Sequence, residues 1–175
     1  MLLVGGASRR FGSPKALAPF GDETLAARAW RLLGAVCDER IALGKTAESE
    51  GLPFAVLDDE AAVRAPLAGL VAGLRAATTD LILALPVDCP LLEPDDLRAL
   101  AAACADAAVP PTGPLPGAYR KSALPVLERR LAAGQLKLRD ALRELDASVV
   151  RLEPARLANA NTPEELARLA ASGPV

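Results

Sequence analysis

The sequence predicts an α/β domain with a mainly parallel sheet. Short apolar segments alternate with segments of helical periodicity, which is the order typical of strand–helix–strand units. The most apolar segment, residues 81–85, has no polar position, as expected for a central strand covered by helices on both faces. At 175 residues, of which 51% are hydrophobic and 24% charged, the chain is long enough to bury a core of its own. We therefore expect one domain over residues 1–175.

The first half of the chain supplies three predicted strands and two predicted helices. Asp22 or Thr24 can begin the first helix, whose apolar positions between Leu25 and Leu33 recur at helical spacing. Pro66 fits the first turn of the second helix, because the first N–H groups of a helix have no partner within it. The strands are short, mostly apolar runs that end at a glycine or an aspartate pair, namely residues 2–4, 40–43 and 54–57.

The second half begins with the central strand and continues mainly with helices. The central strand ends at Pro86, and the next helix is predicted to start near Pro94. Val109 leads into a proline-rich loop over residues 110–116. The remaining predicted elements are helices over residues 124–131, 138–145 and 163–169 and a strand over residues 149–152.

Composition excludes several classes of function. The 20 basic and 22 acidic residues are mixed along the chain and only 3% of residues are aromatic, so we expect no nucleic acid as partner. No apolar run has the length of a transmembrane helix and no signal peptide is evident, so we expect a cytoplasmic protein without membrane contact. Histidine is absent, which excludes Ser-His-Asp catalysis and histidine-ligated zinc. The three cysteines lack CxxC spacing and are interpreted as buried thiols.

The first predicted strand is followed by a loop suited to binding phosphate. Its glycines let backbone amides approach a phosphate closely, and its cationic side chains can neutralise the charge. The spacing matches neither the dinucleotide-binding fingerprint nor the Walker loop. A glycine turn with solvated arginines is the alternative, but so many glycines and cations in one short loop favour phosphate binding. These residues are Gly5, Gly6, Gly12, Arg9, Arg10 and Lys15.

Acidic residues follow two other predicted strands. Asp88 comes directly after the central strand, where an isolated carboxylate needs a cation, and Mg²⁺ carrying substrate phosphates is a natural candidate. A helix cap or an ion pair with arginine explains Asp88 equally well, so both interpretations stay open. Asp58 and Asp59 follow the third predicted strand, although acidic pairs in loops are commonly just solvated.

Four motifs occur in a fixed order along almost the whole chain. They are Leu-Val-Gly-Gly-x-Ser-x-Arg-Phe-Gly-x-x-Lys over residues 3–15, Ala-Pro-Leu-Ala-Gly over 65–69, Asp-Cys-Pro over 88–90, and Asn-Ala-Asn-Thr-Pro-Glu-Glu-Leu over 159–166. Together they resemble the molybdenum cofactor guanylyltransferases, a family of nucleotidyltransferases. The resemblance implies a Rossmann-like three-layer α/β/α sandwich of the nucleotide-diphospho-sugar transferase, or glycosyltransferase-A, type.

The resemblance also assigns roles to the residues that match these motifs. It implies that Lys15 contacts the nucleotide phosphates and that Asp88 binds Mg²⁺. Asn159 and Asn161 are implied to line the crevice near the transferred phosphate, although the segment that contains them is also a good helix start. The nucleotide-binding residues implied are Leu3, Val4, Gly5, Gly6, Lys15, Asp88 and Asp59, with Asp58 as the alternative to Asp59.

The activity implied is transfer of GMP from GTP to the phosphate of molybdenum-molybdopterin, with release of pyrophosphate. The attacking phosphate is already ionised near neutral pH and needs no general base, which agrees with the absence of histidine. Arg10, Lys15 and Asp88 are the predicted catalytic residues, and the position of Arg10 favours contact with the leaving pyrophosphate. The 110–116 loop either holds the pterin or is a surface connection. Molybdoenzymes or their chaperones are the expected transient partners.

Three other functions stay open at this point. Cytidylyl transfer to the same cofactor is the closest, but such enzymes tend to have Ala-Gly where this chain has Gly5-Gly6. The absence of a side chain at Gly6 leaves room beneath the base and favours guanine. Sugar-phosphate nucleotidyltransferases are usually longer. A non-catalytic nucleotide-binding module would not need Arg10, Lys15 and Asp88 together.

Overall fold

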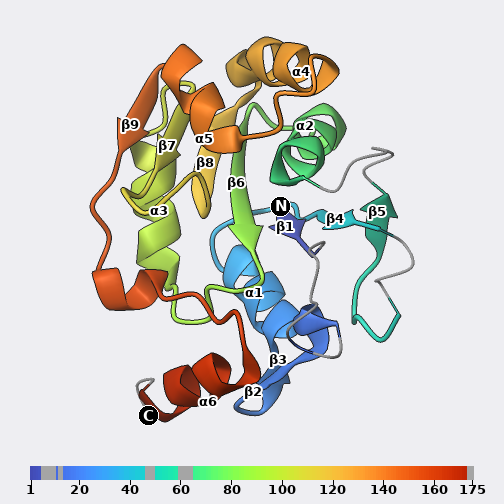
Figure 1. Cartoon of the computed structure of the whole chain (residues 1–175), viewed down its shortest axis with the longest axis vertical. Coiled ribbons are helices and arrows are strands. Elements are labelled where there is room, and N and C mark those ends of the chain that lie inside the picture. Colours follow the sequence, from blue (N-terminus) through green and yellow to red (C-terminus); the bar gives the residue numbers. More distant parts are fainter. Residues whose placement is uncertain (5–10, 12–13, 46–49, 59–64, 173–175) are drawn as a thin grey trace.

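The computed structural model describes residues 1–4, 11, 14–45, 50–58 and 65–172. Seven strands form one sheet in the order β5-β4-β1-β6-β8-β7-β9, and β2 and β3 form a separate hairpin (Figure 1). The strands are β1 (Leu2–Leu3), β2 (Pro19–Phe20), β3 (Glu23–Thr24), β4 (Ala42–Gly44), β5 (Val56–Asp58), β6 (Leu81–Pro86), β7 (Ala107–Val109), β8 (Gly117–Arg120) and β9 (Ala147–Val149). The sheet is mainly parallel as predicted, with β8 running antiparallel to its neighbours β6 and β7.

Helices cover both faces of this sheet. The α-helices are α1 (Leu25–Gly34), α2 (Pro66–Ala76), α3 (Pro94–Ala102), α4 (Leu124–Ala132), α5 (Leu138–Ala141) and α6 (Pro163–Ser172). Short 3₁₀ segments are η1 (Lys15–Leu17), η3 (Lys121–Ala123), η4 (Leu142–Glu144) and η5 (Pro154–Leu157). Among the described residues, none of these helices combines the length and apolar character that crossing a membrane requires.

Two large hydrophobic clusters show that the helices form two layers. Leu2 packs in the cluster that contains α1 and α3, whereas its neighbour Leu3 packs in the cluster that contains α2, α4 and α5. Ile82 and Leu83 divide between the two clusters in the same way, because successive side chains of a strand point to opposite faces. The fold is therefore the α/β/α sandwich that the resemblance implies.

A third, smaller hydrophobic cluster joins α6 to β2. Leu166 of α6 packs with Phe20 of β2 and with the buried Ala160. Helix α6 accordingly lies beside β2 at the bottom of Figure 1. This contact places the last predicted motif next to the segment that follows the phosphate-binding loop.

Some predicted elements differ from the structure. Residues 117–120 form β8, although the sequence analysis predicted no strand there, and β9 begins at Ala147 rather than at residue 149. The helix predicted over residues 138–145 divides into α5 and η4. The β2–β3 hairpin was also not predicted, and it turns at Gly21, whose φ of 64° lies in the left-handed region.

The start of α1 gives a first testable prediction. Thr24 is the N-cap, and its Oγ1 accepts a hydrogen bond from the backbone N–H of Ala27 at 3.2 Å. Replacing Thr24 with alanine removes that acceptor, and we expect a loss of about 1 kcal/mol in the free energy of unfolding, measured by urea denaturation. Thr24→Asn is the matched control and should retain most of the stability, because asparagine also caps well. Equal stability of the alanine variant and the parent would contradict the assignment.

Candidate active site

The predicted site residues that the structure describes lie at one edge of the sheet. Strands β1, β4, β5 and β6 run parallel, so their carboxyl ends lie at the same edge. Val4 follows β1, Asp58 ends β5, and Asp88 lies two residues beyond β6. The 110–116 loop also leaves from this edge, since β7 runs in the same direction as β6. Val4, Asp58 and Asp88 therefore lie at the same edge of the sheet.

Asp88 is held by the register of the central strand. Val87 and Cys89 on either side of it are buried, whereas the Asp88 side chain is 25% exposed. The backbone C=O of Asp88 accepts a hydrogen bond from the N–H of Ala160 at 3.0 Å. This bond ties the C-terminal segment to the end of β6 without using the carboxylate, which remains available for other partners.

The carboxylate of Asp88 meets the ammonium group of Lys15. Lys15 begins η1, and its Nζ lies 3.0 Å from Asp88 Oδ2 and 3.3 Å from Asn161 Oδ1. These partners are 73 and 146 positions away in the sequence. The Lys15 side chain is only 13% exposed, and its ammonium also lies 5.6 Å from the centre of the Phe11 ring. Three of the four sequence motifs thus converge on one cation.

The last motif both begins a helix and reaches the site. Thr162 caps α6 by accepting a hydrogen bond from the N–H of Glu165, and the Glu165 carboxylate accepts one from the N–H of Asn161. Pro163 occupies the first turn. Because Thr162 provides the cap, the side chain of Asn161 can extend to Lys15 instead. The segment can therefore serve both as the start of a helix and as part of the crevice, the two interpretations that the sequence offers.

Cys89 forms the next contact along the same edge. Its thiol donates a hydrogen bond to Asn159 Oδ1, with 3.0 Å between sulfur and oxygen. Burial, and secondly the neighbouring Asp88 carboxylate, raise the pKa of this thiol far above its ordinary value. Burial is also the main cause that raises the pKa of Cys37 and Cys104. All three cysteines are free, and Cys89 and Cys104 are buried as predicted, while Cys37 is half-buried.

A second ion pair lies at the ends of β4 and β5. Lys45 follows β4, and its Nζ is 3.0 Å from Oδ1 of Asp58. The Asp58 side chain is 40% exposed. The sequence analysis left Asp58 and Asp59 as alternatives for the nucleotide pocket. Asp58 lies at the expected edge, and Asp59 lies outside the described residues.

Leu3 and Val4 lie at the end of β1 with buried side chains. Leu3 belongs to one hydrophobic cluster and Val4 to the other, so a ligand at this edge can meet only their backbone. The nucleotide contacts of both residues stay a prediction, with their main-chain groups as the candidates. The other predicted loop residues, Gly5, Gly6, Arg9, Arg10 and Gly12, lie outside the described residues.

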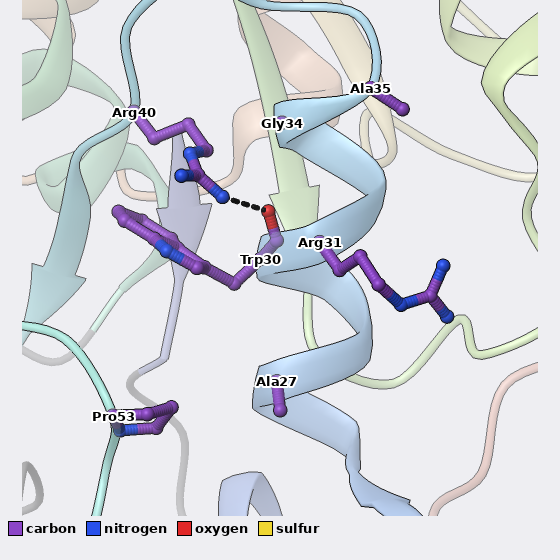
Figure 2. A pocket seen from close by; sticks show the side chains of 7 residues that line it. All are labelled: Ala27, Trp30, Arg31, Gly34, Ala35, Arg40 and Pro53. Atoms are coloured by element: carbon purple, nitrogen blue, oxygen red, sulfur yellow. Dashed lines mark hydrogen bonds between the residues drawn. The ribbon is translucent and has the colours of Figure 1, made fainter.

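A hollow of about 500 Å³ on α1 contains none of the predicted site residues. Figure 2 shows Arg40 above the Trp30 ring, with its guanidinium donating to the Trp30 backbone oxygen at 2.9 Å. Arg31 points away from Arg40 and donates to Glu23, which holds the pKa of that carboxyl below its ordinary value. Both arginines are thus engaged within the protein, and the sheet edge is the better candidate for the active site.

Comparisons with known proteins identify the family of this chain. The MobA-like NTP transferase domain matches residues 1–149. A probable molybdenum cofactor guanylyltransferase of Chloroflexus aggregans is 35% identical over 158 residues, covering 83% of this chain and 76% of that protein. A molybdenum cofactor guanylyltransferase of Pseudomonas putida is 34% identical over 181 residues, covering 95% of this chain and 94% of that protein.

Solved structures show the same fold. Molybdopterin-guanine dinucleotide biosynthesis protein A from Archaeoglobus fulgidus superimposes with a TM-score of 0.78 at 24% identity, covering 98% of this chain and 96% of that one. A 2-C-methyl-D-erythritol 4-phosphate cytidylyltransferase from Thermus thermophilus gives a TM-score of 0.71 at 19% identity, covering 98% of this chain and 96% of that one. At such identities the superpositions establish the fold, and the choice of nucleotide has to come from the sequence relatives and from the site.

Proposed function

This chain belongs to the MobA-like NTP transferase family, and we propose that it transfers GMP from GTP to the phosphate of molybdenum-molybdopterin. One observation carries the proposal: Lys15, Asp88 and Asn161 meet at the carboxyl end of the central strand. They come from three motifs that resemble this family. A cation and a carboxylate at that edge are the groups that phosphoryl transfer requires.

The proposed reaction is a displacement at the α-phosphorus of GTP. A phosphate oxygen of the pterin cofactor forms the new bond to that phosphorus. The bond from the α-phosphorus to the oxygen bridging it to the β-phosphate breaks, and its electron pair leaves with pyrophosphate. Because the attacking oxygen is already ionised, no protein group has to remove a proton, which suits a chain without histidine. The protein has to align the two oxygens and neutralise charge.

The donor set around Asp88 fits Mg²⁺. Mg²⁺ prefers oxygen ligands and is commonly held by one or two carboxylates together with substrate phosphates. Asp88 offers one partly exposed carboxylate, and the described residues contain no cluster of three acidic, cysteine or histidine side chains that would form a cage of protein ligands. In this proposal Asp88 holds the metal, which supplies charge neutralisation on the phosphates when bound.

The remaining site residues are assigned by their positions in the sequence motifs. Lys15 contacts the nucleotide phosphates, and Arg10 the leaving pyrophosphate. Backbone groups of residues 3–6 bind the nucleoside, with Asp58 or Asp59 at the edge of the same pocket. Asn159 and Asn161 flank Ala160, which bonds to the backbone of Asp88, and in this proposal they approach the transferred phosphate.

The proposed setting is the cytoplasm, where the three free cysteines stay reduced. The product would pass to molybdoenzymes or their chaperones through transient contacts. The chain has a net charge of −2 and few aromatic residues, and this composition does not favour nucleic acid as a partner.

The choice of base provides the test of this function. With Mg²⁺ present, we expect GTP to raise the melting temperature more than CTP at equal concentration, because a ligand that binds the native state stabilises it. Pyrophosphate should then be released when GTP and molybdenum-molybdopterin are supplied together. Thermal shift and a coupled pyrophosphate assay measure the two effects.

Two controls make this test decisive. ATP should give a smaller shift than GTP, and omission of the pterin substrate should abolish pyrophosphate release. An equal or larger shift with CTP would overturn the guanylyl assignment and support cytidylyl transfer. Binding of GTP without any pyrophosphate release in the complete mixture would indicate a nucleotide-binding module instead of an enzyme.

A further inference from the structure

We propose that Cys89 is a positioning residue, whose thiol orients the side-chain amide of Asn159 so that the amide N–H groups face the substrate phosphates. The inference deepens the proposed function and rests on it. In the Asp-Cys-Pro motif, the resemblance assigns a role to Asp88 and none to the cysteine between it and Pro90. The argument comes from the contacts of the thiol.

The contact joins a buried group to an exposed one. Cys89 is 6% exposed, whereas Asn159 is an exposed residue 70 positions later in the chain. The sulfur lies 3.0 Å from Asn159 Oδ1 but 3.8 Å from Asp88 Oδ1. The single thiol proton is therefore directed to the amide carbonyl of Asn159.

The direction of this bond decides what Asn159 presents to a ligand. An amide group has one accepting and one donating end, and here the accepting oxygen is taken by the thiol. Within the described residues, no acceptor binds the Asn159 nitrogen, so its two N–H groups remain available. Phosphate oxygens accept hydrogen bonds and cannot donate them when ionised. The reverse orientation would place a carbonyl oxygen against the phosphates and repel them.

The backbone of this segment does not depend on the thiol. Ala160 is fully buried in the cluster with Phe20 and Leu166, and its N–H donates to the backbone oxygen of Asp88. On the far side, Asn161 bonds to Lys15. Loss of the thiol proton should therefore release the Asn159 side chain while the segment stays in place. This separates a positioning role from a purely structural one.

A role in positioning Asn159 and a role in merely filling the core predict opposite results for two substitutions of Cys89. Cys89→Ser keeps a donor, whereas Cys89→Val fills the buried space without one. If Cys89 positions Asn159, the valine variant should lose roughly 10-fold in kcat/KM, as is typical of groups that orient site residues, and the serine variant should retain most of the activity. If Cys89 merely fills the core, valine should be tolerated and serine should lower the melting temperature. Cys89→Ala, which also lacks a donor, replaces the valine variant if the latter does not fold.

A double substitution tests whether the effect passes through Asn159. Once Asn159 is replaced by alanine, adding Cys89→Val should cause no further loss of kcat/KM, because the group it orients is gone. A further loss in the double variant, or parent activity of the valine variant, would overturn the proposal.

The contact itself can be tested without turnover. In ¹⁵N–¹H spectra, the side-chain amide signals of Asn159, identified by their absence in Asn159→Ala, should shift in the valine variant and stay near their original positions in the serine variant. If the parent protein releases no pyrophosphate, the proposed function fails, yet these spectra still decide whether Cys89 orients Asn159. Unchanged signals in the valine variant would refute the positioning role in either case.

Discussion

Replacing Asp88 with asparagine is expected to lower pyrophosphate release by about two to three orders of magnitude. Asparagine keeps the shape of the side chain and an accepting oxygen, but it loses the negative charge that a hard cation requires. The melting temperature without ligands should change little, because the backbone oxygen of Asp88 still accepts from Ala160 and its side chain is partly exposed. The part of the GTP-induced thermal shift that depends on Mg²⁺ should disappear.

The same chemical change at the other end of β6 is the matched control. Asp80 precedes this strand and pairs with Arg120 at 2.7 Å, with 62% of its side chain exposed. Asp80→Asn therefore removes a carboxylate next to the same strand without touching the candidate site, and it should leave both turnover and the metal response intact. A fully active Asp88→Asn variant that keeps its metal response would contradict the proposed role of Asp88.

The sequence predicts the fold well where local pattern and burial agree. Residues 81–85 are continuously apolar and form β6 between two helical layers, and α2 begins at Pro66 as the proline indicates. Strand β8 could not be predicted in this way. Its four residues, Gly-Ala-Tyr-Arg, show no alternation, since the first three are all buried, and they follow a proline-rich loop. Antiparallel pairing with β6 makes this segment a strand, and such pairing is a property of the tertiary structure.

The site was partly predictable for a similar reason. The motifs identify Lys15, Asp88 and Asn161 separately, but their contacts span 73 and 146 positions and depend on how α6 returns to β2. Lys15 follows a glycine-rich segment, yet its side chain is only 13% exposed and contacts Asp88 and Asn161. The pattern gave no reason to connect Cys89 with Asn159. That contact depends on the register between the end of β6 and the C-terminal segment.

Replacing Lys15 with alanine is expected to reduce turnover about as much as Asp88→Asn does. The loss corresponds to roughly 2–4 kcal/mol of transition-state stabilisation. In the proposed function, its ammonium neutralises charge on the nucleotide phosphates. Its partner Asp88 is partly exposed and can be hydrated when the cation is removed, so the protein should still fold. Pyrophosphate release measures the loss of turnover, and GTP titration measures the accompanying loss of nucleotide affinity. Lys121→Ala, at the amino end of β6, is the matched control and should behave like the parent.

The Lys15 and Asp88 variants should differ in how they respond to metal. An ammonium contacts phosphate without any metal, so Lys15→Ala should lower the GTP-induced thermal shift even when Mg²⁺ is removed by a chelator. Asp88→Asn should leave that metal-free shift in place and remove only the increment that Mg²⁺ adds. The two residues are 3.0 Å apart, and a purely structural ion pair would give the same response in both variants. Lys15 would then be reassigned to holding Asp88, and the phosphate contact would have to come from another residue of the loop.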